Sequence, residues 1–225
     1  MTVRRAAFVF CLGISFFGAA AACTRSAKKA QPVAALSKTP LAAAEFAPLR
    51  EAWADRKLER NALDTFIARH PQDGAVPLAK VYLAFLLMDG GQLVAADGVL
   101  SSLDEMPPGT TRDLGTVARA RSLRLHGAPQ SALDSLRPLV GKVVDEADRE
   151  IFLEELALSA IGAHVDYEAL AYLDAWLRGV GEDDKERVKA KIGQMLETLP
   201  RPVLEQTYRT MRERGAASGY GPDTQ

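Results

Sequence analysis

The sequence predicts an all-α fold in which about ten helices, after an N-terminal export signal, pair as antiparallel hairpins. Three observations predict it. Between residues 41 and 214, apolar residues recur at intervals of three and four, and no convincing stretch alternates with a period of two. Groups of Gly and Pro interrupt this pattern at regular intervals, where helices should end. Small and apolar residues also recur with a period of about 36 residues.

Residues 1–22 have the parts of a bacterial export signal. Arg4 and Arg5 form a positive start, residues 6–22 form an apolar run that ends in small residues, and Cys23 follows. This order resembles a lipoprotein signal, which implies cleavage before Cys23 and attachment of lipid, such as palmitate, to that residue. The resemblance also implies an outer-membrane address, because Thr24 is not the Asp that usually marks retention in the inner membrane.

Two other interpretations of the signal stay open. An ordinary secretory signal cut at the same bond would leave Cys23 as a free thiol, which is unusual for the sole cysteine of an exported protein. An uncleaved anchor would have to span the membrane with roughly 15 strongly apolar residues, fewer than the ~20 that a spanning helix needs.

The segments on either side of the helical region are predicted to be flexible. Residues 23–40 contain lysines and two prolines without helical periodicity, which is typical of a linker. Residues 215–225 contain three glycines and a proline, which is typical of a disordered tail. Cys11 leaves with the signal, so the mature chain cannot form an internal disulfide. Its stability must therefore come from the packed core of residues 41–214.

The 36-residue period is clearest in two central copies. A small residue on the first helix, a glycine in the turn and a small residue on the second helix would let two helices approach closely, and leucines would seal the pair against its neighbour. Copies with the same spacing but weaker matches lie on either side, as expected for capping units. The matching sets are Ala84, Leu87, Gly91, Ala96, Leu100 and Leu103, then Ala120, Leu123, Gly127, Ala132, Leu136 and Leu139, with outer copies at Arg50, Trp53, Lys57, Ala62, Phe66 and Arg69 and at Ala157, Ala160, His164, Ala169, Leu173 and Trp176.

Over residues 43–180 this pattern resembles the tetratricopeptide repeat, a helix-turn-helix unit of about 34 residues. The resemblance implies hairpins stacked into a right-handed solenoid, with the first helix of each pair lining a concave groove. A related helical-hairpin array stays an alternative, because aliphatic residues mostly replace the typical aromatic residues of the first helix. A fifth hairpin or capping pair is expected over residues 183–214.

Two groups of residues are candidates for binding a partner. Val81, Phe85 and Met88 share one face of a helix that is apolar all round, so they are expected either to floor a groove or to be covered by neighbouring hairpins. Arg121 and Arg124, which with Arg112 and Arg119 form an arginine cluster, share a face three residues apart. They suit carboxylates of a partner or, alternatively, acids of this chain such as Asp113, Asp148 or Glu154.

Composition and motifs argue against several functions. Without the two arginines of the signal, 26 basic residues face 29 acidic ones, a net charge of −3 that offers nucleic acid no general attraction. The three histidines, at positions 70, 126 and 164, lie at predicted helix ends and lack the i, i+4 spacing of a metal-binding helix. The paired acids 154–155 and 183–184 are expected on solvated faces or at helix starts. We therefore expect no catalytic residue, metal, cofactor, nucleic acid or small-molecule substrate.

The leading functional hypothesis is a non-enzymatic adaptor that is anchored in the outer membrane and binds protein partners in the periplasm. A lipid anchor followed by helical repeats resembles the lipoproteins that scaffold outer-membrane assembly, secretion or motility machines. From about residue 77 to 214, including residues 191–200, the chain also resembles the helical N-terminal region of lipoprotein activators of penicillin-binding proteins. The alternative is therefore a regulator of a peptidoglycan synthase, and a purely structural tether is a third possibility.

Overall fold

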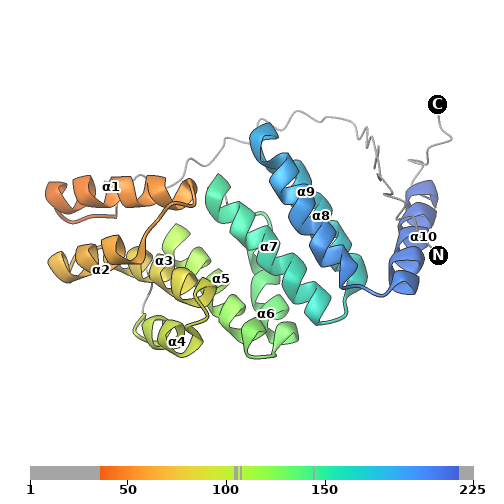
Figure 1. The fold of residues 1–225 in the computed structure, drawn as a ribbon, viewed down its shortest axis with the longest axis horizontal. Coiled ribbons are helices and arrows are strands. Elements are labelled where there is room, and N and C mark those ends of the chain that lie inside the picture. Colours follow the sequence, from red (N-terminus) through yellow and green to blue (C-terminus); the bar gives the residue numbers. More distant parts are fainter. Residues whose placement is uncertain (1–35, 104–105, 107, 144, 218–225) are drawn as a thin grey trace, which may run out of the picture.

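The computed structural model describes residues 36–103, 106, 108–143 and 145–217. These residues form ten α-helices and a short 3-10 helix, and they contain no strand. The helices follow one another along the long axis of the molecule, from α1 and α2 at one end to α10 at the other (Figure 1). The predicted all-α class and number of helices are confirmed. The elements are α1 (Pro40–Ala54), α2 (Arg60–Arg69), α3 (Val76–Asp89), α4 (Leu93–Ser101), α5 (Thr110–Leu125), α6 (Pro129–Leu136), η2 (Arg137–Leu139), α7 (Glu146–Gly162), α8 (Asp166–Gly179), α9 (Glu182–Glu197) and α10 (Arg201–Ala217).

One turn geometry recurs at four helix ends. Arg56, Gly91, Gly127 and His164 all have positive φ, between 58° and 80°. At each, the backbone N–H donates to the carbonyl three residues earlier, and the next N–H donates to the carbonyl five residues before it, as in Gly91 to Met88 and Gln92 to Leu87. This Schellman motif satisfies carbonyls at the helix end that would otherwise be unpaired. The predicted turn positions agree in three copies, and in the first copy the turn residue is Arg56 rather than Lys57.

Consecutive helices pack against each other most closely in the middle of the chain. The pairs α3 with α4, α5 with α6 and α7 with α8 are in close contact, and α3 also contacts α5, which contacts α7. In the two central copies, the repeated alanines and leucines are buried, with one exception, Leu123, which is 38% exposed. Close packing of small residues between helices is what the 36-residue period predicts.

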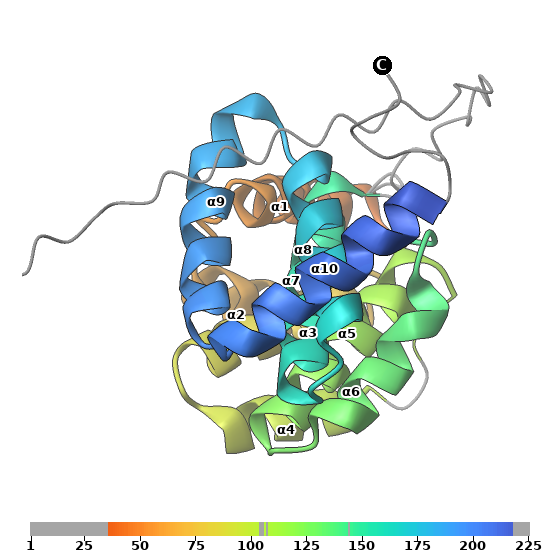
Figure 2. The same cartoon turned by 90° about the vertical axis from the view of Figure 1, so that its right-hand side faces the viewer.

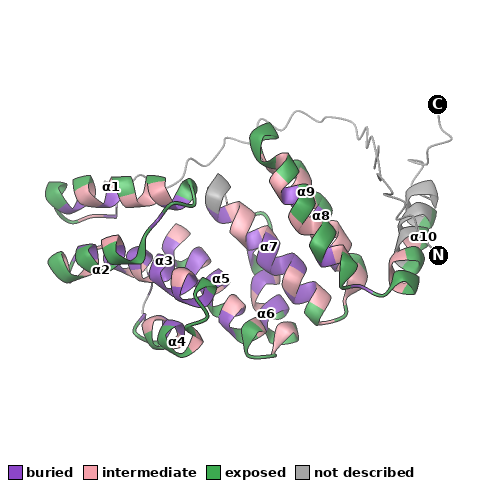
Figure 3. Ribbon diagram, viewed as in Figure 1, coloured by how far each residue is buried: buried purple, intermediate pink, exposed green. Residues whose placement is uncertain are grey.

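The core follows α3, α5 and α7 (Figure 3). Helix α3 is buried on nearly all sides, as its almost wholly apolar sequence requires, with Lys80 as the one charged residue before Asp89. A smaller cluster joins α7, α8 and α9 around Trp176, which is fully buried with Leu173 and Val188. Helix α7 therefore packs against both the main core and this smaller cluster.

The ends of the helical region differ from the prediction. Helix α1 already begins at Pro40, because the Thr39 hydroxyl accepts a hydrogen bond from the N–H of Ala42 and Pro suits the first helical position. The preceding residues are held too, since the N–H of Lys38 donates to Asp73 over 2.8 Å. Helix α10 continues to Ala217 and crosses α8 (Figure 2), so the close contact of α10 is with α8, where the prediction expects a hairpin with α9.

Some predictions lie outside the described residues. These are the signal over residues 1–22, Cys23, the linker up to residue 35, and residues 218–225 of the tail. Among the helices of the described part, none is long and apolar enough to cross a membrane.

Replacing Ala96 or Ala132, the small residues on the second helices of the two central copies, by leucine should destabilise the protein. Ala96 and Ala132 are fully buried between helices, so Ala96→Leu or Ala132→Leu should lower the free energy of unfolding by about 1–3 kcal/mol through overpacking. Urea denaturation followed by circular dichroism measures the loss. Lys142→Leu, at an exposed position, is the control and should change it by less than about 0.5 kcal/mol. Equal losses at all three positions would contradict the packing role of the two alanines.

Candidate functional site

The face of α3 that the sequence suggests as the floor of a groove is buried, and helix α1 covers part of it. Val81, Phe85 and Met88 are only 0%, 1% and 6% exposed. Trp53 of α1 lies against the Phe85 ring, with 5.5 Å between ring centroids, and stacks on Tyr82 at 4.3 Å. The expectation that these three side chains floor an open groove is therefore wrong, and the alternative, that the chain itself covers them, holds. Trp53 of the first helix covers Phe85, whereas Val81 faces Gly115 of α5.

The predicted arginine site is also used internally. Arg124 donates two hydrogen bonds to the carboxylate of Glu155, over 2.9 and 3.1 Å. Arg121 pairs with Asp89 and lies 3.4 Å from Glu155, with its guanidinium over the Phe85 ring. These arginines are therefore not presented to a partner's carboxylate. The alternative, that they pair with acids of this chain, holds, but the acids are Asp89 and Glu155. The sequence suggests Asp113, Asp148 or Glu154 instead. The other two arginines of the cluster, Arg112 and Arg119, bind backbone carbonyls of Met106 and Leu103.

Helix α7 carries the acids that connect these elements. Glu155 is 1% exposed and Glu154 is 8% exposed, which contradicts the expectation of a solvated face for this pair. Burial raises the pKa of Glu155, against the opposing effect of Arg124 and Arg121. Buried charges need partners, and the acids of α7 obtain them from helices α5 and α9 and from the turn after α1. The pairs besides those of Glu155 are Arg56 with Glu150, Arg187 with Glu150, and Lys191 with Glu154.

The C-terminal half of α1 is attached to the start of α7 by polar contacts. The Trp53 indole N–H donates to Asp148 over 3.2 Å, and Arg50 binds Asp145 over 2.9 Å. Burial, followed by the charge of Asp145, raises the pKa of Asp148 to about 7, although Trp53 and Arg50 both favour its ionised form. Among the residues that the structure describes, the second oxygen of Asp148 and the hydroxyl of Tyr82 have no hydrogen-bond partner, although both are buried. Burial also raises the pKa of Tyr82.

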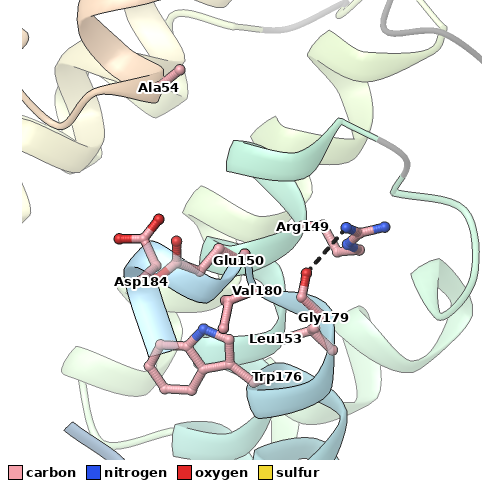
Figure 4. Close-up of a pocket in the computed structure, with 9 residues that line it drawn as sticks. Ala54, Arg149, Glu150, Leu153, Trp176, Gly179, Val180 and Asp184 are labelled. Atoms are coloured by element: carbon pink, nitrogen blue, oxygen red, sulfur yellow. Dashed lines mark hydrogen bonds between the residues drawn. The ribbon is translucent and has the colours of Figure 1, made fainter. Parts of the chain in front are cut away.

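A pocket of about 200 Å³ lies beside this junction, where the end of α1 faces the α8–α9 turn across α7 (Figure 4). Its apolar walls are Leu153, Val180 and Trp176. Two more lining residues, at positions 179 and 181 of the turn, are glycines, which have no side chain to fill the pocket. The other lining residues are Ala54, Arg149, Glu150 and Asp184.

The polar groups of this pocket differ in whether they already have partners. Glu150 is paired with Arg56 and Arg187, and Asp184 accepts hydrogen bonds from Arg187. The salt bridges and hydrogen bonds lower the pKa of Glu150 against the effect of burial, which is the largest single contribution and acts in the opposite direction. In contrast, the indole nitrogen of Trp176 is buried and has no hydrogen-bond partner. The pocket therefore contains an indole donor without a hydrogen-bond partner in the described residues. Beside it, Glu150 Oε1 is in ion pairs with Arg56 and Arg187 but accepts no hydrogen bond there, and Asp184 is hydrogen-bonded to Arg187.

Sequence reasoning did not find this pocket. The repeat assigns Trp176 a packing role, and residues 179–181 serve as a turn signal, which agrees with their position between α8 and α9. The spacing of Trp176 from the turn predicts that they are near each other. It does not predict that α1, more than 120 residues earlier, closes the third side.

The other residues considered for chemistry lie at helix ends. His70 ends α2 and bonds Glu45, His126 ends α5 and bonds Asp97, and His164 occupies the turn after α7. Within the described ranges, no three His, Cys, Asp or Glu side chains are grouped so that they could hold a metal ion. Comparisons of the chain with protein-family models, with curated proteins and with solved structures found no match.

Proposed function

We propose that this protein is a non-enzymatic adaptor, attached by lipid on Cys23 to the outer membrane and facing the periplasm, which binds a protein partner in an envelope complex. The export signal and Cys23 support the location. The observation that carries the binding role is the pocket beside α7, where a buried indole donor has no hydrogen-bond partner among the residues that the structure describes.

The helix arrangement supports an adaptor built from hairpins. The same Schellman turn ends four helices at spacings close to the sequence period, and α3, α5 and α7 contact one another in order. We propose that these hairpins form a right-handed array of the tetratricopeptide type, in which α3, α5 and α7 line the concave side. In such an array α1 occupies part of that side and the pocket is the part left open, beyond the end of α1.

The lipid anchor makes a direct prediction. Cells supplied with an alkyne palmitate analogue should label the wild-type protein, and Cys23→Ala should abolish the label and leave the protein out of the outer-membrane fraction. Several acyl chains hold a protein to a membrane almost permanently, because each buried methylene contributes about 0.8 kcal/mol. A labelled Cys23→Ala variant, or a wild-type protein without label, would rule out this anchor.

The same tagged protein tests the adaptor role. A photocrosslinking amino acid at Asp184, which lines the pocket, should crosslink to an envelope protein, whereas the same group at exposed Arg201 should not. Identification of the crosslinked protein also decides between the two classes. A secretin or outer-membrane barrel supports the adaptor, and a peptidoglycan synthase supports the alternative that the sequence resemblance to activator lipoproteins suggests. Equal crosslinking at both positions would contradict a specific site.

A further inference from the structure

We propose that the pocket between the end of α1, α7 and the α8–α9 turn binds an extended acidic peptide segment of the partner, with a backbone carbonyl on the Trp176 indole N–H and a carboxylate on Arg149. This inference rests on the proposed adaptor function and names the chemistry of the partner.

The first contact is indicated by Trp176. Its side chain is fully buried, held among Ala157, Leu173 and Val188 of the smaller core cluster, so the direction of its N–H is set by packing. The nitrogen lies on the edge of the indole that faces Val180 and Glu150 (Figure 4). A buried donor without a partner is unfavourable, because it has lost its hydrogen bond to water. A ligand that supplies a carbonyl oxygen offsets this cost, which gives it an advantage over binding at an ordinary surface.

The second contact is indicated by Arg149. Its guanidinium donates to the carbonyl of Gly179 over 3.3 Å and makes no ion pair with any carboxylate in the described ranges. The acids of the pocket, by comparison, are bound by Arg56 and Arg187. The charge still available to a ligand is therefore positive, and an Arg fork suits a carboxylate.

The positions of the two donors set the shape of the ligand. Arg149 and Trp176 lie on either side of Val180 (Figure 4), so a segment that crosses Val180 can meet both donors. The pocket volume of about 200 Å³ is below the 300 Å³ at which cofactor and drug sites begin, and suits an aliphatic side chain against Leu153. The fit is therefore to a peptide with an aliphatic and an acidic residue a few positions apart.

Synthetic fluorescent heptapeptides test this chemistry on the protein purified from membranes in detergent. Each peptide carries one Leu and, two to four positions away, Asp, Asn or Lys in an otherwise Gly and Ser sequence. Fluorescence anisotropy should show the tightest binding for an Asp peptide, about tenfold weaker binding for its Asn counterpart and the weakest for Lys. The proposal is overturned if Lys peptides bind best, or if no peptide binds at 1 mM, a concentration corresponding to about 4 kcal/mol of affinity.

Variants separate the two contacts. Arg149→Gln should remove the preference for Asp over Asn, and Trp176→Phe should weaken both peptides equally, because it removes the N–H and keeps an aromatic ring. Gly179→Leu should block binding without unfolding, since a Cβ there would meet only Leu153 and Arg149, at 3.9 and 4.0 Å. Gly193→Leu, where a Cβ meets nothing within 4 Å, is the matched control on α9 and should bind normally. Unchanged binding in Gly179→Leu would exclude the pocket. If these results fail while lipid labelling and specific crosslinking succeed, the adaptor function stands and this ligand chemistry does not.

Discussion

Replacing Arg121 and Arg124 together by glutamate is expected to unfold the protein at neutral pH, because both guanidinium groups neutralise the buried carboxylate of Glu155. Arg124 binds it through two hydrogen bonds and Arg121 lies 3.4 Å away. Removing the partner of a buried ion costs about 3–5 kcal/mol, and two new carboxylates at the same place add repulsion. The combined loss is comparable with the whole stability of a domain, about 5–15 kcal/mol.

Circular dichroism at neutral pH measures the expected loss of helix. Arg178→Glu with Arg201→Glu is the matched control, since these side chains are 64% and 89% exposed and their ion pairs in the described part of the chain are with neighbours on their own helices. It should leave the protein folded, because exposed ion pairs contribute about 0–1 kcal/mol. If the reversal at positions 121 and 124 left the protein as stable as this control, the buried cluster would not hold α5 to α7. Loss of a partner in this variant would therefore report unfolding rather than a lost contact.

Much of the fold follows from local patterns in the sequence. Gly91 and Gly127 mark the turns because their backbone has positive φ, which glycine adopts without strain. The alanines at 96 and 132 mark close helix contacts because a small side chain is needed there whatever the neighbour is. These signals depend on residues near in sequence, so a periodicity analysis finds them.

The covered face of α3 shows what periodicity leaves open. The uninterrupted apolar sequence around Phe85 requires cover on every side, and it contains no information on which element supplies it. Over Phe85 the cover is Trp53, 32 residues earlier, whose ring packs at a tilt against it and whose N–H is directed by Asp148, 95 residues later. Similarly, spacing shows that Arg121 and Arg124 share a face. Their partner is Glu155 rather than Glu154, and a shift of one residue on a helix turns a side chain by about 100°.

The attachment of α1 to α7 is expected to weaken as the pH rises towards neutrality. Asp148 is buried at this junction, where it faces Trp53 and Arg50 of α1, Tyr82 of α3 and Asp145. Its pKa is about 7 in the folded protein and about 3.9 in an unfolded chain. Between these values the folded state holds a proton that the unfolded chain has released. Between about pH 4 and pH 7 the free energy of unfolding therefore falls by about 1.4 kcal/mol per pH unit, or about 4 kcal/mol in all. Above about pH 7 the contribution of Asp148 no longer changes with pH.

Asp148→Asn isolates this effect, because asparagine stays uncharged and keeps an oxygen that accepts the Trp53 hydrogen bond. Other carboxylates, such as Asp73 and Glu168 with lowered pKa, titrate equally in both proteins, so their contributions cancel in the difference. Urea denaturation should give the variant nearly the same free energy of unfolding as the wild type at pH 4, and a value higher by up to about 4 kcal/mol at pH 8. Asp134→Asn, at a carboxylate that is 55% exposed, should show no comparable change with pH. A difference between Asp148→Asn and wild type that is the same at both pH values would show that Asp148 is not protonated in the folded protein, and that α1 is held at this junction without a titrating group.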